Sequence, residues 1–421
     1  MKILFIASYY PPSSHGWGMM QLCEEVANGL FARGHAVSVL TSTYGADGEA
    51  SYPYPIDRLL VIDPDFRSSR PAMIQFFVGR RSRERQAVAH LRRLVDKFAP
   101  DVVFAWDTDG LPKPMLAAAE NLPNSVMAYY LAAYQPEMPD EYIAFWQVPP
   151  RHWVAKGTKR PLAKIALSIL EREGKPIILR YDNVACVSDY LRRRMVSKGL
   201  ISPGAVVIYN GLDLAHFSAG RDRARTFSAE GLKCLVAGRM VPDKGIHTAI
   251  EALGLLRRLG ALDGISLTVL GDGPAHYLDY LKGLVAEGNV QDSVTFRHPV
   301  PREQMPKVLQ EHDILILPSE YPEPLARSMQ EGMAMGLLVI GTTTGGSGEL
   351  LVHEKTGLVF EPANPSSLAR QLERVKEQPE LAARLTEAGR QRIVEEFSIE
   401  RTIEQIEQYL SRLVRGATRA P

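Results

Sequence analysis

The chain has 421 residues, of which 45% are hydrophobic, and its 49 Lys and Arg residues balance 48 Asp and Glu residues, giving a formal net charge of +1. This length favours two domains, and the apolar content excludes an intrinsically disordered chain. The balanced charge disfavours a nucleic-acid-binding protein, which needs an excess of basic residues.

Cysteine usage and apolar runs bear on the cellular location. Cys23, Cys186 and Cys234 are odd in number and far apart, which is unlike a disulfide framework or a zinc site and predicts a reducing cytoplasm. The sequence has no apolar run near the ~18 residues that span a bilayer. Residues 1–12 lack the cleavage site of a signal peptide. We therefore expect a cytoplasmic enzyme.

Short apolar runs alternate with longer amphipathic segments along the chain. The runs expected to be strands are residues 2–8, 35–42, 101–106, 183–188 and 205–210, then 233–239, 266–272, 293–298, 313–319 and 337–343. The segments expected to be helices include residues 18–33, 245–260, 303–311 and 324–335. Strands without polar alternation, each followed by a helix, are typical of parallel sheets covered on both faces. The predicted fold class is α/β, with doubly wound domains.

The alternation is interrupted at residues 213–231, which are polar and basic. We place the linker there, with domains at 1–217 and 218–393. The chain from Pro365 onward is predicted to be helical, and Ser398 can cap a last helix. That helix carries an apolar stripe, which must dock on another surface. The stripe consists of Ile399, Ile403, Ile406, Leu410 and Leu413.

In open parallel sheets, ligands bind beyond the carboxyl ends of the strands. The loop after the first expected strand contains Gly16, Trp17 and Gly18. Glycines there would let the backbone approach an anion. The loop lacks the G-x-G-x-x-G pattern, so an ordinary strand–helix loop is an equal alternative.

Two cations follow the strand expected at 233–239. Arg239 and Lys244 share one strand–helix loop. An arginine that bridges two oxygens, beside the point charge of a lysine, suits a diphosphate. Two solvated surface charges are the alternative.

Two glutamates and a glycine-rich turn follow the last two expected strands. Glu323 precedes a proline at an expected helix start, and Glu331 is predicted two turns further, on nearly the same face. Paired carboxylates can bind the hydroxyls of a sugar and a ribose, but the same spacing recurs elsewhere in the chain. Gly345, Gly346 and Gly348 either offer N–H donors to a phosphate or form only a tight turn.

Two D-x-D patterns give a competing signal, Asp63 with Asp65 and Asp107 with Asp109. Such pairs hold a metal–diphosphate in some transferases, and the second also resembles the strand end of haloacid-dehalogenase-type phosphatases. A phosphatase needs a further acidic pair in the same domain, and none is evident before the linker. The sequence has no His/Cys cluster with metal-ligand spacing and no G-x-S-x-G. We expect no metal site.

Taken in order, these motifs resemble those of the GT-B retaining glycosyltransferases of family 4. The resemblance covers most of the chain and runs through YYPPSSHGWG, ARGHAVSVLTS, VIYNGLD, AGRMVPDKG, VLGDGP, ILPSEYPEPLARSMQEGMAMG and GGSGELLVHEKTGLVFEP. It implies two Rossmann-like domains facing a cleft, with the final helix, residues 394–421, packing back on the N-terminal domain. It also implies a nucleotide-sugar co-substrate and no metal or other cofactor.

The resemblance implies roles for matching positions. Arg239 and Lys244 would neutralise the donor diphosphate in place of a metal, Glu331 would hold the ribose, and Glu323 would contact the donor sugar. The catalytic residues would then be Arg239, Lys244 and Glu323. The other donor contacts would come from the loop with Gly16, Trp17 and Gly18, the base-recognition loop with His298 and Val300, and the turn of Pro324, Leu325, Ala326 and Arg327.

Some positions depart from the family pattern. Trp106 and Asp107 stand where many relatives carry a histidine that contacts the donor sugar, so we assign them to the acceptor and sugar side. Ala326 and His298 each replace a usual glycine. These departures leave the sugar and the base-recognition geometry open, whereas the diphosphate and ribose contacts are kept.

The prediction is a metal-independent retaining transferase that moves a sugar from a UDP-sugar to a hydroxyl acceptor, which is lipid-linked, a glycan or a small molecule. The alternatives are a nucleotide-sugar epimerase and a non-catalytic nucleotide-sugar binding protein. The basic segment 151–164 either contacts an anionic membrane face peripherally or is a solvated loop. The arginine-rich segment 80–93 is predicted to be a helix face.

Overall fold

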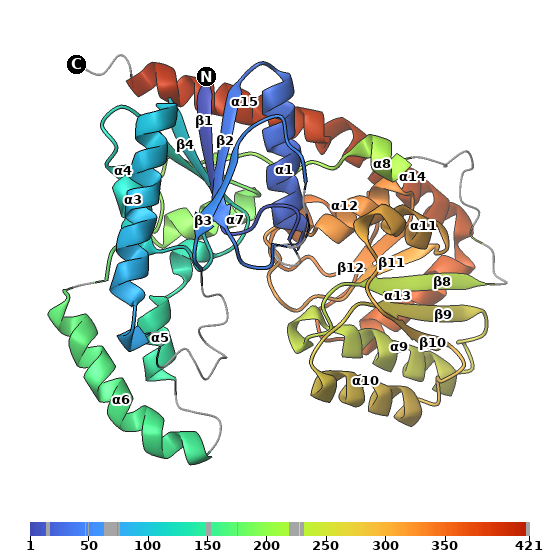
Figure 1. Ribbon diagram of the computed structural model, residues 1–421. Helices are drawn as coiled ribbons and strands as arrows, with labels where there is room; N and C mark the ends of the chain where they lie inside the picture. Colours follow the sequence, from blue (N-terminus) through green and yellow to red (C-terminus); the bar gives the residue numbers. More distant parts are fainter. Residues whose placement is uncertain are drawn as a thin grey trace. The chain divides into compact units, whose positions relative to one another are not determined.

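The chain folds into two compact units, Met1–Ile208 with Ile403–Pro421, and Tyr209–Thr402 (Figure 1). The computed structural model describes the chain except residues 14–16, 47, 49, 63–73, 75, 149–152, 175, 219–226, 228–230 and 418–421. The backbone but not the side chain is described at Trp17, Asp107, Glu141 and residues 153–158. Within the described part of the chain, no helix is long and apolar enough to cross a membrane.

The first unit is built on a seven-stranded sheet in the order β3-β2-β1-β4-β5-β6-β7. Every neighbouring pair runs parallel, and Ile3 on β1 is in register with Val37 on β2 and Val102 on β4. This order is that of a Rossmann-like, doubly wound domain. The strands are β1 Lys2–Ala7, β2 Ala36–Ser42, β3 Ile56–Leu60, β4 Val102–Asp107, β5 Val126–Leu131, β6 Val184–Cys186 and β7 Val206–Val207.

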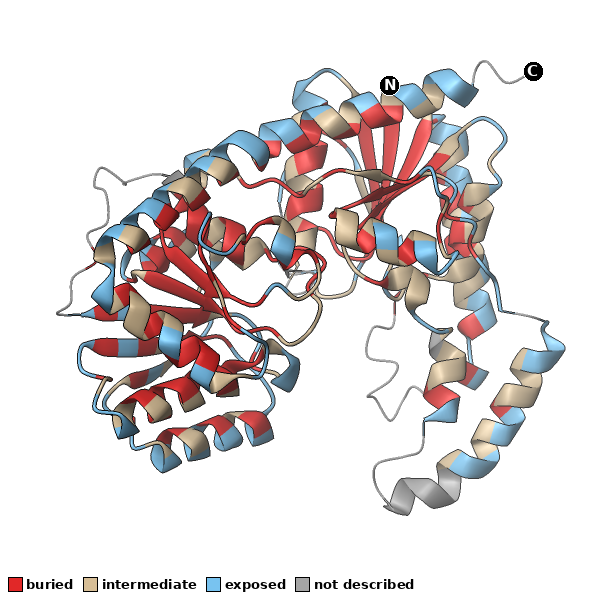
Figure 2. Cartoon of the chain, turned by 180° about the vertical axis from the view of Figure 1, so that it is seen from behind, coloured by how far each residue is buried: buried red, intermediate tan, exposed pale blue. Residues whose placement is uncertain are grey.

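Helices cover this sheet, and its central strands β1 and β5 are buried along almost their whole length (Figure 2). The first-unit helices are α1 Trp17–Ala32, α3 Arg80–Phe98, α4 Lys113–Glu120, α5 Glu141–Gln147, α6 Trp153–Arg172 and α7 Asp189–Ser197. The segment 80–93 is helical, as predicted, and opens α3. Buried leucines on one side of α3, Leu91 and Leu94, explain why this very basic helix packs at all.

The second unit has a six-stranded parallel sheet in the order β10-β9-β8-β11-β12-β13. Its strands are β8 Leu232–Ala237, β9 Ile265–Leu270, β10 Val294–Arg297, β11 Ile314–Leu317, β12 Leu338–Gly341 and β13 Leu358–Val359. Its helices are α8 Leu214–Ser218, α9 Ile246–Arg258, α10 Ala275–Glu287, α11 Met305–Gln310, α12 Arg327–Ala334, α13 Pro365–Glu377 and α14 Pro379–Glu396. The prediction of two doubly wound α/β domains is therefore confirmed.

The boundary between the units lies between Ile208 and Tyr209, earlier than the expected 217/218. The reason is α8, which packs with α11 and α12 of the second unit. Phe217 in α8 is fully buried, and the guanidinium of Arg302 lies 5.7 Å from its ring centroid. Because the segment after Asp213 is mostly polar, the sequence does not indicate that Phe217 is buried in the second unit.

The last helix, α15 Ile399–Ala417, joins the first unit from Ile403 onward. Ser398 caps it, because its Oγ accepts a hydrogen bond from the Arg401 N–H at 3.2 Å. Ile403, Ile406 and Leu410 of the expected stripe are buried, which confirms that the stripe docks. Within the first unit, the Glu407 carboxylate binds Arg33 Nη1 and His35 Nε2, each at 2.7 Å, next to the end of α1.

Candidate functional site

Most of the predicted site residues lie in the second unit, in loops that follow the carboxyl ends of its strands. The loop after β8 contains a short 3₁₀ helix, η2 Pro242–Lys244, and the loops after β11 and β12 approach it. The backbone carbonyl of Asp243 accepts hydrogen bonds from the N–H groups of Glu320 and Tyr321, both at 3.0 Å. Because β8 and β11 are neighbours in the sheet, these loops meet at one edge, where open α/β sheets bind ligands.

Lys244 and Glu323 are in direct contact at this edge. The Lys244 Nζ lies 2.5 Å from Glu323 Oε1. The hydroxyl of Ser319 donates to the same Glu323 oxygen at 2.7 Å. Glu323 is only 8% exposed, so its charge needs these donors. The contact places a cation and a carboxylate from two separate loops at one point.

The backbone around Ser319 is fixed by two threonines that follow β12. Thr342 Oγ1 donates to the Ser319 carbonyl oxygen at 2.6 Å. Thr344 Oγ1 lies 3.1 Å from the same oxygen and 3.0 Å from the Tyr321 carbonyl oxygen. The loops after β11 and β12 are thereby held together, which positions the Glu323 carboxylate.

Two glycines allow these loops to approach closely. Gly245 has φ 64°, and a Cβ there would lie 2.0 Å from the Pro318 carbonyl oxygen. Gly345 has φ 69°, and the next N–H, that of Gly346, donates to the Glu323 carbonyl oxygen at 2.7 Å. That N–H already has a partner, so at Gly345 and Gly346 the tight-turn interpretation fits the structure better than phosphate binding.

The helix α12 begins at Arg327, later than the expected residue 324, because Ala326 has extended backbone angles. Glu323 therefore lies in the loop before the helix, and the prediction that Glu323 and Glu331 share one helix face is wrong. Glu331 lies on α12 with its carboxylate 3.7 Å from Arg327 Nε. The N-cap residue Ala326 makes no side-chain capping hydrogen bond, and its carbonyl oxygen accepts from the N–H groups of Met329 and Gln330 at 3.2 and 3.4 Å.

The remaining predicted residues of the second unit differ in exposure. Leu325 and Ala326 are buried in the turn with Pro324. Arg239 is exposed, and among the described residues its side chain has no hydrogen bond or ion pair, whereas its backbone carbonyl accepts from the Val241 N–H at 3.0 Å. His298 is exposed on the loop after β10, 3.2 Å from Asp272 Oδ1, and Val300 on the same loop is half-buried.

The predicted residues of the first unit give less information. Gly16, with Asp63 and Asp65, lies outside the described residues, as do the side chains of Trp17 and Asp107; Gly18 lies in the first turn of α1. Trp106 is 1% exposed, stacks on Tyr130 with ring centroids 4.3 Å apart, and donates its Nε1–H to the Met19 carbonyl oxygen. Trp106 is thus a core residue, which corrects its assignment to the acceptor side.

Sequence reasoning missed Ser319, Thr342 and Thr344. A signal was available, because each lies within three residues of the carboxyl end of a buried apolar strand, where ligand loops begin. What the sequence could not show is that the two strands are neighbours in the sheet.

Comparison with known proteins covers both units. Residues 221–392 match the family model described as Glycosyl transferases group 1, and residues 18–216 match Glycosyltransferase Family 4. The chain is 27% identical to glycogen synthase of Mycobacterium tuberculosis over 411 residues, 94% of this chain and 91% of that protein. It is 29% identical to the putative glycosyltransferase YtcC of Bacillus subtilis, over 52% of this chain and 58% of that protein.

The structure also resembles solved structures. The crystal structure of Anabaena Alr3699/HepE in complex with UDP superposes with a TM-score of 0.67 and 17% identity, covering 98% of this chain and 100% of that one. A glycosyltransferase from Rickettsia africae gives a TM-score of 0.68 at 17% identity, with 98% of each chain covered. At this level of identity the similarity establishes the fold.

Proposed function

Since the chain belongs to the group 1, family 4 glycosyltransferases of the GT-B fold, we propose that it transfers a sugar from a UDP-sugar to a hydroxyl acceptor, with retention of anomeric configuration and without a metal ion. The observation that carries this proposal is the contact between Lys244 and Glu323 at the carboxyl edge of the second sheet. The UDP held by the similar Anabaena protein supports the choice of nucleotide.

The cations would act on the diphosphate. Breaking the bond between the anomeric carbon and the diphosphate leaves negative charge on the departing oxygens. Lys244 and the exposed Arg239 lie on the same loop after β8, where both can face such a charge. Losing one fixed donor to a developing oxyanion costs about 3 kcal/mol of transition-state stabilisation. In this role the two side chains replace a divalent ion.

Glu323 would contact the donor sugar. When Lys244 turns to the diphosphate, Ser319 remains as a donor to Glu323 Oε1, so the buried carboxylate keeps a partner. The N-terminal end of α12, where the helix dipole is positive, suits the phosphate next to the sugar. Glu331, further along the helix, would accept hydrogen bonds from the ribose hydroxyls.

Retention needs no protein nucleophile in this scheme. The acceptor oxygen attacks the anomeric carbon on the face from which the diphosphate leaves. The bond from that carbon to the phosphate oxygen breaks as the bond to the acceptor oxygen forms, and the acceptor proton passes to the departing phosphate. The protein contributes charge stabilisation and positioning.

Nucleotide binding tests the site directly. A ligand at 100 times its dissociation constant adds roughly 2.7 kcal/mol to the unfolding free energy, so a thermal-shift panel of UDP, GDP, ADP and NAD should single out UDP. We expect Lys244→Ala to abolish the response to UDP and Glu331→Ala to weaken it, whereas Lys233→Ala, an exposed control on β8, leaves it unchanged. Wild-type affinity for every nucleotide in both site variants would refute the assignment.

Turnover tests the reaction. Transfer from UDP-sugar to an acceptor should persist in excess chelator, and the product should keep the anomeric configuration of the donor. Epimerisation of the UDP-sugar without acceptor would point to the epimerase alternative. Tight nucleotide-sugar binding with no turnover on any acceptor would point to a binding protein.

A further inference from the structure

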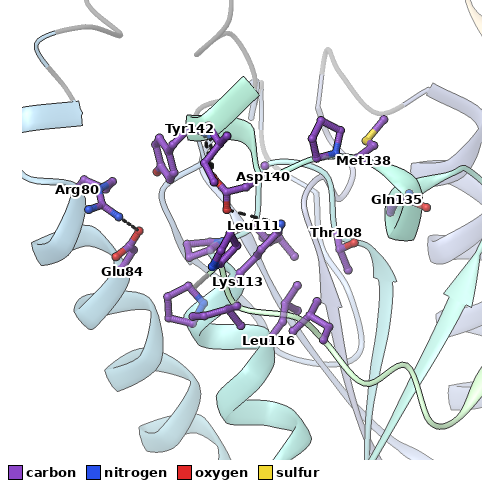
Figure 3. A pocket seen from close by; sticks show the side chains of 18 of the residues that line it. Arg80, Glu84, Thr108, Leu111, Lys113, Leu116, Gln135, Met138, Asp140 and Tyr142 are labelled. Atoms are coloured by element: carbon purple, nitrogen blue, oxygen red, sulfur yellow. Dashed lines mark hydrogen bonds and ion pairs between the residues drawn. The ribbon is translucent and has the colours of Figure 1, made fainter. Parts of the chain in front are cut away.

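A pocket with a volume of about 220 Å³ opens in the first unit, in addition to the site in the second (Figure 3). Its lining includes residues 108–114, which follow β4, and Gln135 with residues 138–140, which follow β5. It therefore lies at the carboxyl ends of two central strands, the usual ligand position in such a sheet. The start of α3 and the end of α6 complete its wall.

Most of the wall is apolar. Leu111, Leu116 and Leu179 are buried beneath it, and the Tyr142 ring lies at one side. Behind Tyr142, α5 and α6 form a small core of their own around Phe76, Phe145, Trp146 and Ala166. This separate core gives the wall a fixed support, as a preformed ligand pocket requires.

Exposed apolar side chains gather at the rim. Val61, Met138 and Ile177 all line the pocket and are 55%, 43% and 39% exposed. Next to Ile177 is Ile178, which is 85% exposed but does not line the pocket. Leaving such side chains in water forgoes hydrophobic stabilisation, and their clustering marks a surface that is covered when a ligand binds.

The charged groups of the lining neutralise one another. Arg80 lies between the Phe76 and Tyr142 rings, at 5.0 and 5.2 Å, and pairs with Glu84 at 3.2 Å and with Glu173. Lys113 lies 3.6 Å from Asp140, whose side chain also caps α5. With Arg83 and Asp109 added, the lining holds three basic and four acidic side chains. Arg81, outside the lining, also binds Glu173 at 2.8 Å. The balanced charge gives an anionic ligand no basic excess, whereas carboxylates readily accept hydrogen bonds from hydroxyls.

We propose that this pocket binds the acceptor, and that the acceptor is a neutral amphiphile: a hydroxyl-bearing compound with a hydrocarbon chain. The chain would lie against the leucine wall and cover the exposed rim. The hydroxylated part would face the acidic side chains and present the hydroxyl that receives the sugar. This inference rests on the proposed function for its acceptor role.

Octyl glucoside below its micelle concentration is the probe, with binding measured by isothermal titration calorimetry. We expect octyl glucoside to bind at least tenfold more tightly than octyl sulfate, and glucose to show no detectable binding. Ile177→Ser should raise the dissociation constant of octyl glucoside about fivefold or more. Ile178→Ser is the matched control and should leave it unchanged, because that side chain does not line the pocket. Circular dichroism should show both variants folded.

Three results would overturn the proposal. The first two are equal octyl glucoside affinity in Ile177→Ser and Ile178→Ser, and binding of octyl sulfate as tight as that of octyl glucoside. The third is that octyl glucoside does not bind, whereas phosphatidylcholine vesicles bind to the wild-type protein and not to Ile178→Ser. The last result would assign the exposed residues to a membrane surface.

The thermal shift with UDP separates this proposal from the proposed function. A normal UDP response without glycoside binding refutes the pocket alone, and glycoside binding without any nucleotide response refutes the proposed function.

Discussion

Gly345 packs so closely on Glu323 that no side chain fits between them: a Cβ at residue 345 would lie 2.3 Å from the Glu323 carbonyl oxygen and 2.7 Å from the Glu323 nitrogen. The two residues also form an isolated parallel bridge. The position of the Glu323 carboxylate thus depends on a glycine in a different loop, beyond the next strand of the sheet.

Replacing that glycine should be costly. Gly345→Ala meets the Glu323 backbone and places a side chain at φ 69°, so we expect the unfolding free energy to fall by about 2–3 kcal/mol. Gly348→Ala is the control, because its Cβ would meet Thr343 only at an ordinary 3.5 Å. Urea unfolding of both variants measures the difference, and equal stabilities would contradict the close packing seen here.

Ser319 should act as a positioning residue for Glu323. Ser319→Ala removes the 2.7 Å hydrogen bond to a buried carboxylate, and we expect a loss of about 1–2 kcal/mol in unfolding free energy. UDP-sugar turnover should fall in kcat more than it rises in KM, since the freed carboxylate is misplaced during transfer. Thr295→Ala serves as the control, because Thr295 is exposed on β10. A stability loss with unchanged kcat would show a purely structural role.

The pairing of Glu137 predicts an acid-sensitive contribution to stability. Hydrogen bonds from Arg194, and next from Lys198, lower the pKa of Glu137 from 4.5 to about 2. A carboxyl whose pKa is lower in the folded state stabilises the fold above the unfolded pKa and loses this contribution as the pH falls toward the folded value. The loss of unfolding free energy between pH 6 and pH 3 should therefore be about 1 kcal/mol smaller in Glu137→Gln than in wild type. Glu171→Gln, exposed on α6, should match wild type.

The cysteines should resist thiol reagents in the folded protein. Cys23, Cys186 and Cys234 are free and buried, and burial raises the pKa of Cys186 to about 12. The thiolate is the reactive form, so a chromogenic thiol reagent at pH 8 should label the native protein very slowly and all three thiols in denaturant. Rapid labelling before unfolding would contradict the burial.

Strand positions could be predicted where β-branched and leucine runs are dense, as in β1, β2 and β11. The strand β5 was missed, because its VMAYYL sequence mixes alanine and tyrosine with a single β-branched residue. The two-residue β13 carries too little pattern to be seen. Local composition thus finds strands within dense aliphatic runs, including the short β6 and β7, and fails for the charged β3, whose sequence is IDRLL, and for the aromatic β5.

The site could be predicted only in parts. Lys244 and Glu323 each follow an expected strand, and this placement is confirmed. Their contact depends on β8 lying next to β11, a neighbour relationship that no local pattern encodes. Trp106 is a core residue that the sequence wrongly placed in the site. An aromatic residue at the end of a strand has the same sequence pattern whether it faces a ligand or the core.

The helix α15 has a consequence for synthesis on the ribosome. Residues up to Ile208 emerge early, yet the end of α1, with Arg33 and His35, gains its partner Glu407 only after the whole second unit has been translated. Domains commonly fold as they leave the ribosome. In this protein the earlier unit must wait for the later one, so a nascent chain halted before Ile403 exposes apolar surface on its first unit.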